Sequence, residues 1–246
     1  MSIQSNSWCF LAAAVLLGPF GTALAQSASL QQCANGTAST PRACAGSGWV
    51  TGNINKKAGH YAEGQAVPFR LILSGYIPGS TGHTVTLEWD TTDGGRHAYD
   101  YLATFDRTET LAMGNDPCSG VAGCSLGTFT TIPIPLDPQV AGAGVTQAPG
   151  VFALFGGTIT SVSAYTLIGS YSGRSTTLIT LVFTANQTNS VLAWSGHLAS
   201  RIDWGLADGT AADVNGSFQT RLFQSSGRSQ GNQARSISGV APPGTF

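Results

Sequence analysis

The sequence predicts an all-β protein, an antiparallel two-sheet sandwich of jelly-roll or immunoglobulin-like type with at most one or two short helices. Three observations lead to this fold class. Apolar and polar residues alternate with a period of two, β-branched residues dominate the alternating segments, and glycine or proline separates one segment from the next. Almost no helical pattern lies between the segments, so βαβ units are not expected.

Composition indicates a globular chain. The 246 residues are 42% hydrophobic and only 9% charged, with a formal net charge of -1. A disordered chain would combine lower hydrophobicity with a higher net charge. The 11 basic residues are balanced by 12 acidic ones and form no run longer than Lys56-Lys57. No nucleic-acid partner is therefore expected, because phosphate binding leaves a basic footprint.

Residues 1–25 are predicted to be a signal peptide. The apolar stretch 9–25 ends in Ala-Leu-Ala, which fits a cleavage site of the A-x-A type. Pro19 interrupts this stretch, which leaves it shorter than the roughly 20 residues that a membrane span needs. The expected location is secreted, extracellular or at the cell surface, with no membrane span after cleavage.

The cysteines support this compartment. Removal of residues 1–25 leaves four of them, an even number that suits disulfide formation in an oxidising environment. Proximity along the chain favours the pairs Cys33–Cys44 and Cys118–Cys124 among the three possible pairings. A zinc site is the alternative, but neither pair has C-x-x-C spacing or a nearby histidine.

The strands follow the alternating segments. Segments 67–74 and 84–89 are expected to form an antiparallel pair, because the loop 75–82 between them contains the proline and glycines of a reversing turn. Further strands are expected at 129–134, 158–165, 176–185, 191–194 and 217–223.

Segment 97–109 is the exception to the strand pattern. From Ala98 onward its apolar residues recur at i, i+3, i+4 and i+7, which predicts a short helix over one sheet edge. The alternation of Tyr99, Tyr101 and Ala103 is also compatible with a strand.

The chain is expected to hold one folded domain. The β-sandwich domain is assigned to residues 26–225. Residues 226–246 are predicted to be a polar, flexible tail, because they are rich in glycine and end near Pro242-Pro243.

Several motifs in order along the chain carry a resemblance to a known group of proteins. They are CANGT, WVTGNIN, HYAEGQAVPFR, GHTVTLEWDTTDGGRHAYDYLATFDRTE, DPCSGVAGC, IPIPLDP, GHLASRIDWG and GNQARSISG. The chain resembles an uncharacterised extracellular module in the amino-terminal region of large secreted or cell-surface bacterial proteins, where immunoglobulin-like or prealbumin-like repeats often follow. The resemblance implies a bacterial extracellular β module and brings no activity, ligand or catalytic residue with it.

Asp90 and Asp93 are the candidate metal ligands. They lie on a glycine-containing turn, and calcium prefers carboxylate oxygens. Their spacing matches no twelve-residue calcium loop, so a solvated turn is the favoured alternative. Apart from calcium, no cofactor is expected.

Aromatic residues beside polar ones are the candidates for ligand binding, since an indole ring combines an apolar face with a polar N–H group. Trp89 and Trp194 continue apolar runs and are expected in the core. The candidates are Trp204, Asp203, His197 and Trp49.

Two histidine–carboxylate pairs are close in sequence, namely His60 with Glu63 and His97 with Asp100. Each pair could supply a base and the carboxylate that orients it. The favoured interpretation of Glu63 is a cap at a turn or strand end, and that of His60 is an exposed or partly packed ring.

The expected function is a secreted or cell-surface structural or interaction module, adhesion included, without catalysis. Its expected partner is an extracellular glycan or protein. A carbohydrate-binding, lectin-like module is the first alternative and would show exposed tryptophans beside carboxylates in a groove. A secreted hydrolase is the second and would show a histidine–carboxylate pair or convergent carboxylates in a pocket.

Overall fold

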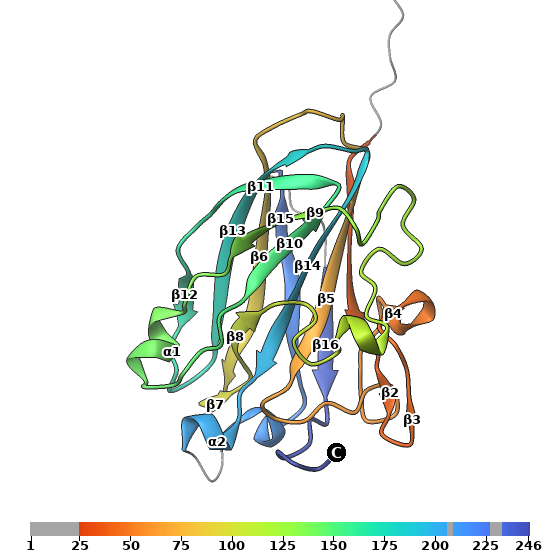
Figure 1. Cartoon of the computed structure of the whole chain (residues 1–246). Helices are drawn as coiled ribbons and strands as arrows, with labels where there is room; N and C mark the ends of the chain where they lie inside the picture. Colours follow the sequence, from red (N-terminus) through yellow and green to blue (C-terminus); the bar gives the residue numbers. More distant parts are fainter. Residues whose placement is uncertain (1–24, 206–208, 227–232) are drawn as a thin grey trace, which may run out of the picture.

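The computed structural model describes residues 25–205, 209–226 and 233–246, which form two antiparallel sheets packed face to face (Figure 1). The predicted all-β two-sheet fold is confirmed. The predicted signal peptide lies outside the described residues, apart from Ala25.

The first sheet has the strand order β4-β1-β5-β14-β10-β9, with β8 joined to β14. Its strands are β1 (Ser27–Cys33), β4 (Trp49–Val50), β5 (Ala66–Ser74), β8 (Tyr99–Ala103), β9 (Phe129–Pro133), β10 (Val151–Phe155) and β14 (Asn189–Leu198).

The second sheet has the order β11-β13-β6-β15-β16, with β12 beside β13 and β7 beside β6. Its strands are β6 (His83–Asp93), β7 (Arg96–His97), β11 (Gly157–Val162), β12 (Thr166–Gly169), β13 (Ser175–Ala185), β15 (Ser217–Ser225) and β16 (Gln233–Ser238). A separate ribbon pairs β2 (Gly36–Thr37) with β3 (Thr40–Pro41).

Helical structure is short. The α-helices in the described ranges are α1 (Pro138–Gly142) and α2 (Arg201–Trp204), with single 3-10 turns η1 (Gly46–Gly48), η2 (Leu111–Met113) and η3 (Ala211–Asp213). Ser200 caps the amino-terminal end of α2, where its Oγ accepts a hydrogen bond from the Ile202 amide. None of the helices in the described part of the chain has the length and apolar character to cross a membrane.

The main core lies between the sheets. Phe69 and Leu71 of β5 and Leu87 and Trp89 of β6 belong to one buried cluster, to which Trp194 of β14 also contributes. Trp89 and Trp194 are fully buried, as predicted. β13 buries every second residue, because its other face meets solvent.

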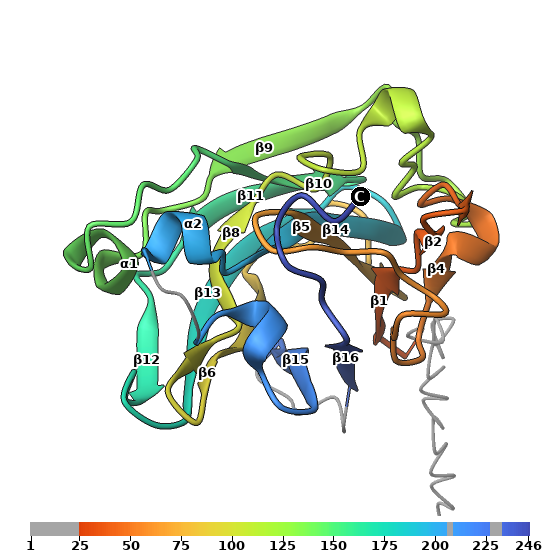
Figure 2. The same ribbon diagram turned by 90° about the horizontal axis from the view of Figure 1, so that it is seen from below.

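The outer face of the first sheet is covered as well. The segment 104–127 runs along it (Figure 2), and Phe105 packs there with Phe155, Val191 and Ala193. A strand covered on both faces is apolar at consecutive positions, which explains why β14 departs from strict alternation. This covering segment also carries one end of the site described below.

Both predicted disulfides are present, Cys33–Cys44 and Cys118–Cys124. The first joins the end of β1 to the loop before η1. The second closes a short loop in the segment that covers the first sheet. The four thiols are therefore not free to bind zinc.

The predicted pairing of 67–74 with 84–89 is wrong. β5 pairs with β1 and β14, whereas β6 pairs with β13 and β15. The loop between them crosses from one sheet to the other, and the two strands face each other through the core. Alternation of apolar and polar residues shows which face of a strand is buried. It does not show which strand is the neighbour, because two strands paired in one sheet and two strands facing each other across the core bury the same face.

The predicted helix over 97–109 is also wrong, and the strand alternative is correct. β8 pairs with β14, and the register shifts between Gly196 and Leu198. Because of this β-bulge, Tyr99 and Leu102 both join the core although they are three positions apart. Of the residues whose spacing suggested a helix, Ala98 and Leu102 join the main core, whereas Tyr101 and Phe105 pack in two other clusters, so they do not form one apolar face.

The prediction of a flexible tail over 226–246 is wrong for residues 233–246, which include β16. β16 pairs with β15 along its length. Its Gln233 side chain accepts from the Leu30 amide at 2.8 Å and donates to the Ala28 carbonyl at 2.7 Å, so it serves the free edge of β1. The polar Gln233 side chain is therefore part of the fold, and its polarity alone does not distinguish this role from that of a residue in a flexible tail.

Candidate functional site

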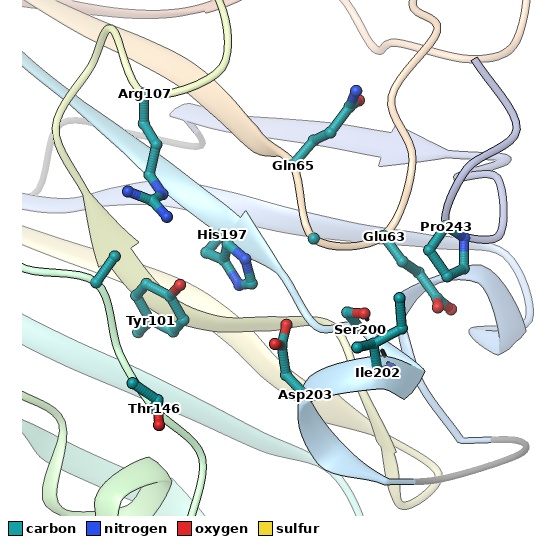
Figure 3. A pocket seen from close by; sticks show the side chains of 12 residues that line it. Glu63, Gln65, Tyr101, Arg107, Thr146, His197, Ser200, Ile202, Asp203 and Pro243 are labelled. Atoms are coloured by element: carbon teal, nitrogen blue, oxygen red, sulfur yellow. Dashed lines mark hydrogen bonds between the residues drawn. The ribbon is translucent and has the colours of Figure 1, made fainter.

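A pocket of about 500 Å³ lies at the end of the sandwich where β14 ends and α2 begins (Figure 3). Its wall combines β8, β14, α2, the segment before β5 and the segment after β8. The side chains that line it include Gln65, Tyr101, Arg107, His197, Ser200 and Asp203.

Asp100 is the buried anchor of this site. Its Oδ1 accepts from His197 Nδ1 at 2.7 Å and from the Tyr101 amide at 2.9 Å, and its Oδ2 accepts from Trp204 Nε1 at 3.0 Å. The side chain is completely buried. These donors hold the carboxylate in one orientation, so the partner imidazole is held as well.

The bulge in β8 creates this arrangement. Gly196 is opposite Leu102 and Leu198 is opposite Tyr99, so His197 alone is opposite both Asp100 and Tyr101. Asp100 binds the edge of the His197 imidazole, and Tyr101 covers its face. A bulge that places two residues opposite one is a recognised way to redirect a side chain.

The His197 ring lies at the centre of the lining side chains (Figure 3). It stacks on Tyr101 with a centroid distance of 4.2 Å and an interplanar angle of 16°. Because a carboxylate only accepts, neutral His197 carries its proton on Nδ1 and keeps a lone pair on Nε2. Nε2 makes no hydrogen bond within the part of the chain that the structure describes.

The electrostatics keep Tyr101 protonated. Burial raises the pKa of its hydroxyl to about 12, the nearby charges of Asp100 and Asp203 add to this rise, and Arg107 opposes it. Tyr101 can therefore donate a hydrogen bond at neutral pH. The same interactions place Arg107 and Asp203 within electrostatic reach of the Tyr101 hydroxyl.

Trp204 is a support of the site and not part of its surface. Its ring is half-buried, stacked on His97 with a centroid distance of 3.6 Å, and it meets Tyr171 edge to face. Its N–H group is taken up by Asp100. Burial lowers the pKa of the stacked His97, against the opposing charge of Asp100, so its ring is neutral at neutral pH.

Glu63 anchors the wall of the pocket beside α2. Its buried carboxylate accepts from Arg201 Nε at 3.0 Å, from the Ala212 amide at 3.1 Å and from Thr210 Oγ1 at 2.5 Å. Burial by itself would raise the pKa of Glu63, but these hydrogen bonds lower it below the ordinary value. The favoured interpretation of Glu63 as a cap agrees with its bonds to backbone amides.

The two close-in-sequence histidine–carboxylate pairs are not formed. His60 Nδ1 contacts the Gly36 carbonyl oxygen, and Glu63 binds Arg201. His97 stacks on Trp204, while Asp100 takes His197 as its partner. The sequence offers Asp100 as a partner of His97 and not of His197, and it does not single out Tyr101, Arg107 or Gln65 as site residues. The period-two pattern of β8 carries no signal for the bulge that brings Asp100 to His197.

Of the four predicted ligand-binding residues, His197 and Asp203 line the pocket and Trp204 lies behind it. Trp49 lies elsewhere. It is buried beside the Cys33–Cys44 disulfide, its Nε1 donates to the Asp116 carbonyl at 2.8 Å, and the Arg70 guanidinium lies 4.9 Å above its ring. The structure thus separates Trp49 from the other three.

The predicted calcium ligands are placed on the second sheet. Asp90 Oδ1 accepts from Arg221 Nη2 at 2.6 Å, and Oδ2 accepts from the Gln219 amide at 2.9 Å. Both oxygens of Asp90 are engaged by protein donors, while Asp93 lies at the end of β6. Within residues 25–205, 209–226 and 233–246, no group of three or more histidine, cysteine, aspartate or glutamate side chains is placed to hold a metal ion.

Comparison with known proteins leaves the site to be interpreted from its own geometry. The chain matches none of the protein-family models, curated proteins or solved structures with which it was compared.

Proposed function

We propose that the protein is an extracellular interaction module that binds a carbohydrate in the pocket between β8, β14 and α2. The observation that carries this proposal is the stacked pair Tyr101–His197 in one pocket with the exposed carboxylate of Asp203. The pocket volume of about 500 Å³ is in the range of small-ligand sites.

The chemistry of the lining suits a sugar. A sugar ring presents apolar C–H faces, which pack on aromatic rings, and hydroxyl groups, which both donate and accept. The Tyr101 hydroxyl donates, and His197 Nε2 and the Asp203 carboxylate accept. The Gln65 side chain offers its N–H groups as donors, since its Oε1 already accepts from the Ala62 amide at 2.9 Å. This mixture of complementary groups around an aromatic pair favours a polyhydroxylated ligand over a purely apolar one.

The extracellular location rests on the sulfur chemistry and on the predicted signal peptide. Disulfides persist in oxidising compartments and are rare in the cytosol. The pairs Cys33–Cys44 and Cys118–Cys124 support export. A secreted or surface-attached module that captures a glycan would serve adhesion.

The test is a glycan array followed by calorimetry with the hits. Asp203→Asn is the informative variant, because Asp203 is exposed and makes no side-chain hydrogen bond within the described residues. We expect a loss of about tenfold in affinity, which corresponds to one hydrogen bond to a charged group.

Asp93→Asn is the matched control, since Asp93 lies away from the pocket lining and should bind normally. Absence of binding by the wild-type protein to any glycan, or equal binding by the Asp203→Asn variant, would refute the proposal. Trp204→Ala is a poorer probe, because it also removes a hydrogen bond from the buried Asp100.

A further inference from the structure

We propose that the same pocket hydrolyses carboxylic esters, with His197 as the general base that activates a water molecule. The proposal rests on this pocket being a ligand site, as proposed above, but it does not depend on the ligand being a sugar. It goes beyond binding because it assigns a reaction to the Asp100–His197 pair.

The four histidines differ in their surroundings. His60 and His83 have a carbonyl oxygen or a hydroxyl as their hydrogen-bond partner, and His97 packs on Trp204 with its Nδ1 unpartnered. Within the described part of the chain, His197 alone has a carboxylate at hydrogen-bond distance and also lines the pocket beside α2.

Burial of the Asp100 carboxylate costs free energy unless the group is fully hydrogen-bonded. His197, Trp204 and the Tyr101 amide donate the hydrogen bonds that it needs. Together these hydrogen bonds fix the Asp100 carboxylate, which in turn holds the His197 imidazole in one orientation with its lone pair on Nε2. In the geometry of known catalytic dyads, such a carboxylate selects the tautomer and stabilises the imidazolium that forms during the reaction.

In this reaction, His197 Nε2 takes a proton from water while the water oxygen bonds to the acyl carbon, and the carbonyl electron pair moves to oxygen. When this intermediate collapses, the bond from the acyl carbon to the alcohol oxygen breaks, and the imidazolium returns its proton to the leaving alkoxide. Ester and water become carboxylic acid and alcohol, so atoms and charges balance.

Other side chains of the pocket favour this reaction over the alternatives. Arg107 lines the pocket and has no ion pair within the described residues, so its charge is available to the oxyanion. Ser200 Oγ is used as the cap of α2 and makes no bond to His197, so water and not serine is the nucleophile. Glycoside cleavage needs two free carboxylates, and in this pocket Glu63 is bound to Arg201, which leaves Asp203 alone.

The experiment follows hydrolysis of 4-nitrophenyl acetate by the chain without residues 1–25. We expect kcat/KM of His197→Gln to fall at least about 100-fold, in the range of general-base contributions. Asp100→Asn should fall in the same direction, and His60→Gln, which changes a histidine outside this pocket, should match the wild type.

Arg107→Ala keeps the test decisive if the buried variants fold poorly. Arg107 is exposed, so its replacement should preserve the near-ultraviolet spectrum while lowering kcat. Equal rates for the wild type, His197→Gln and Arg107→Ala would overturn the activity. A protein that binds a glycan without turning over the ester refutes only this inference, and one that turns over the ester without binding any glycan refutes only the carbohydrate proposal.

Discussion

His197 Nδ1 lies 2.7 Å from Asp100 Oδ1, although 97 positions separate the two residues in the chain. The contact depends on the bulge in β8, which places Asp100 and Tyr101 opposite His197. A single irregularity in strand pairing thus sets both the hydrogen bond and the ring stack that define the pocket.

The charge of Asp100 should matter for stability. Asp100→Asn keeps the shape of the side chain but replaces one acceptor oxygen by an NH₂ group. That group faces donors, because His197, Trp204 and the Tyr101 amide all donate to Asp100. We expect the free energy of unfolding to fall by about 1–3 kcal/mol, the cost of an unsatisfied buried polar group. Urea denaturation measures it. Asp106→Asn, which changes a less buried aspartate outside this network, is the control, and equal loss in both variants would contradict the assigned role.

Glu63 should make stability depend on acidity. Hydrogen bonds hold the pKa of Glu63 in the folded state below its ordinary value. Its contribution is therefore present above the unfolded pKa of about 4.3 and is lost as the pH falls toward the folded value. We expect the Tm of the wild type to fall as the pH is lowered below about 4.3. The Tm of the Glu63→Gln variant should fall less over the same pH range. Parallel Tm curves for the two proteins would exclude this explanation.

The ordered carboxyl-terminal strand should be part of the fold. Ile237 of β16 is 2% exposed, whereas Ile202 is 74% exposed. Ile237→Ala should lower the free energy of unfolding by about 2–5 kcal/mol, and Ile202→Ala should change it little. Because the same substitution is made at both positions, a difference in the free energy of unfolding between the two variants reflects burial and not the type of side chain. An unchanged Ile237→Ala variant would restore the prediction of a loose tail.

The Cys33–Cys44 disulfide should stabilise the amino-terminal edge of the first sheet. Replacement of both cysteines by alanine should cost about 2–4 kcal/mol, because the unfolded chain regains the freedom of the closed loop. Thermal unfolding measures the effect. Trp49 packs on this disulfide, so its fluorescence should change in the same variant.

Much of the fold could be predicted because the relevant signals are local. Alternation along β5, β6 and β13 predicted strands at these positions, and proximity along the chain predicted both disulfides. Of the ligand-binding candidates, His197 and Asp203 do line a common pocket. Side-chain type and spacing suffice for such statements, since period two and loop closure involve only neighbouring residues.

Local patterns along the chain are enough to predict β-strands with one apolar face and two short loops closed by disulfides. The three-dimensional packing is needed to establish that β5 and β6 belong to different sheets, that β16 completes the second sheet, and that Asp100 binds His197 and not His97. The physical reason is that strand pairing and bulges are selected by the packing of residues far apart in the chain, which leaves the local alternation of each strand almost unchanged.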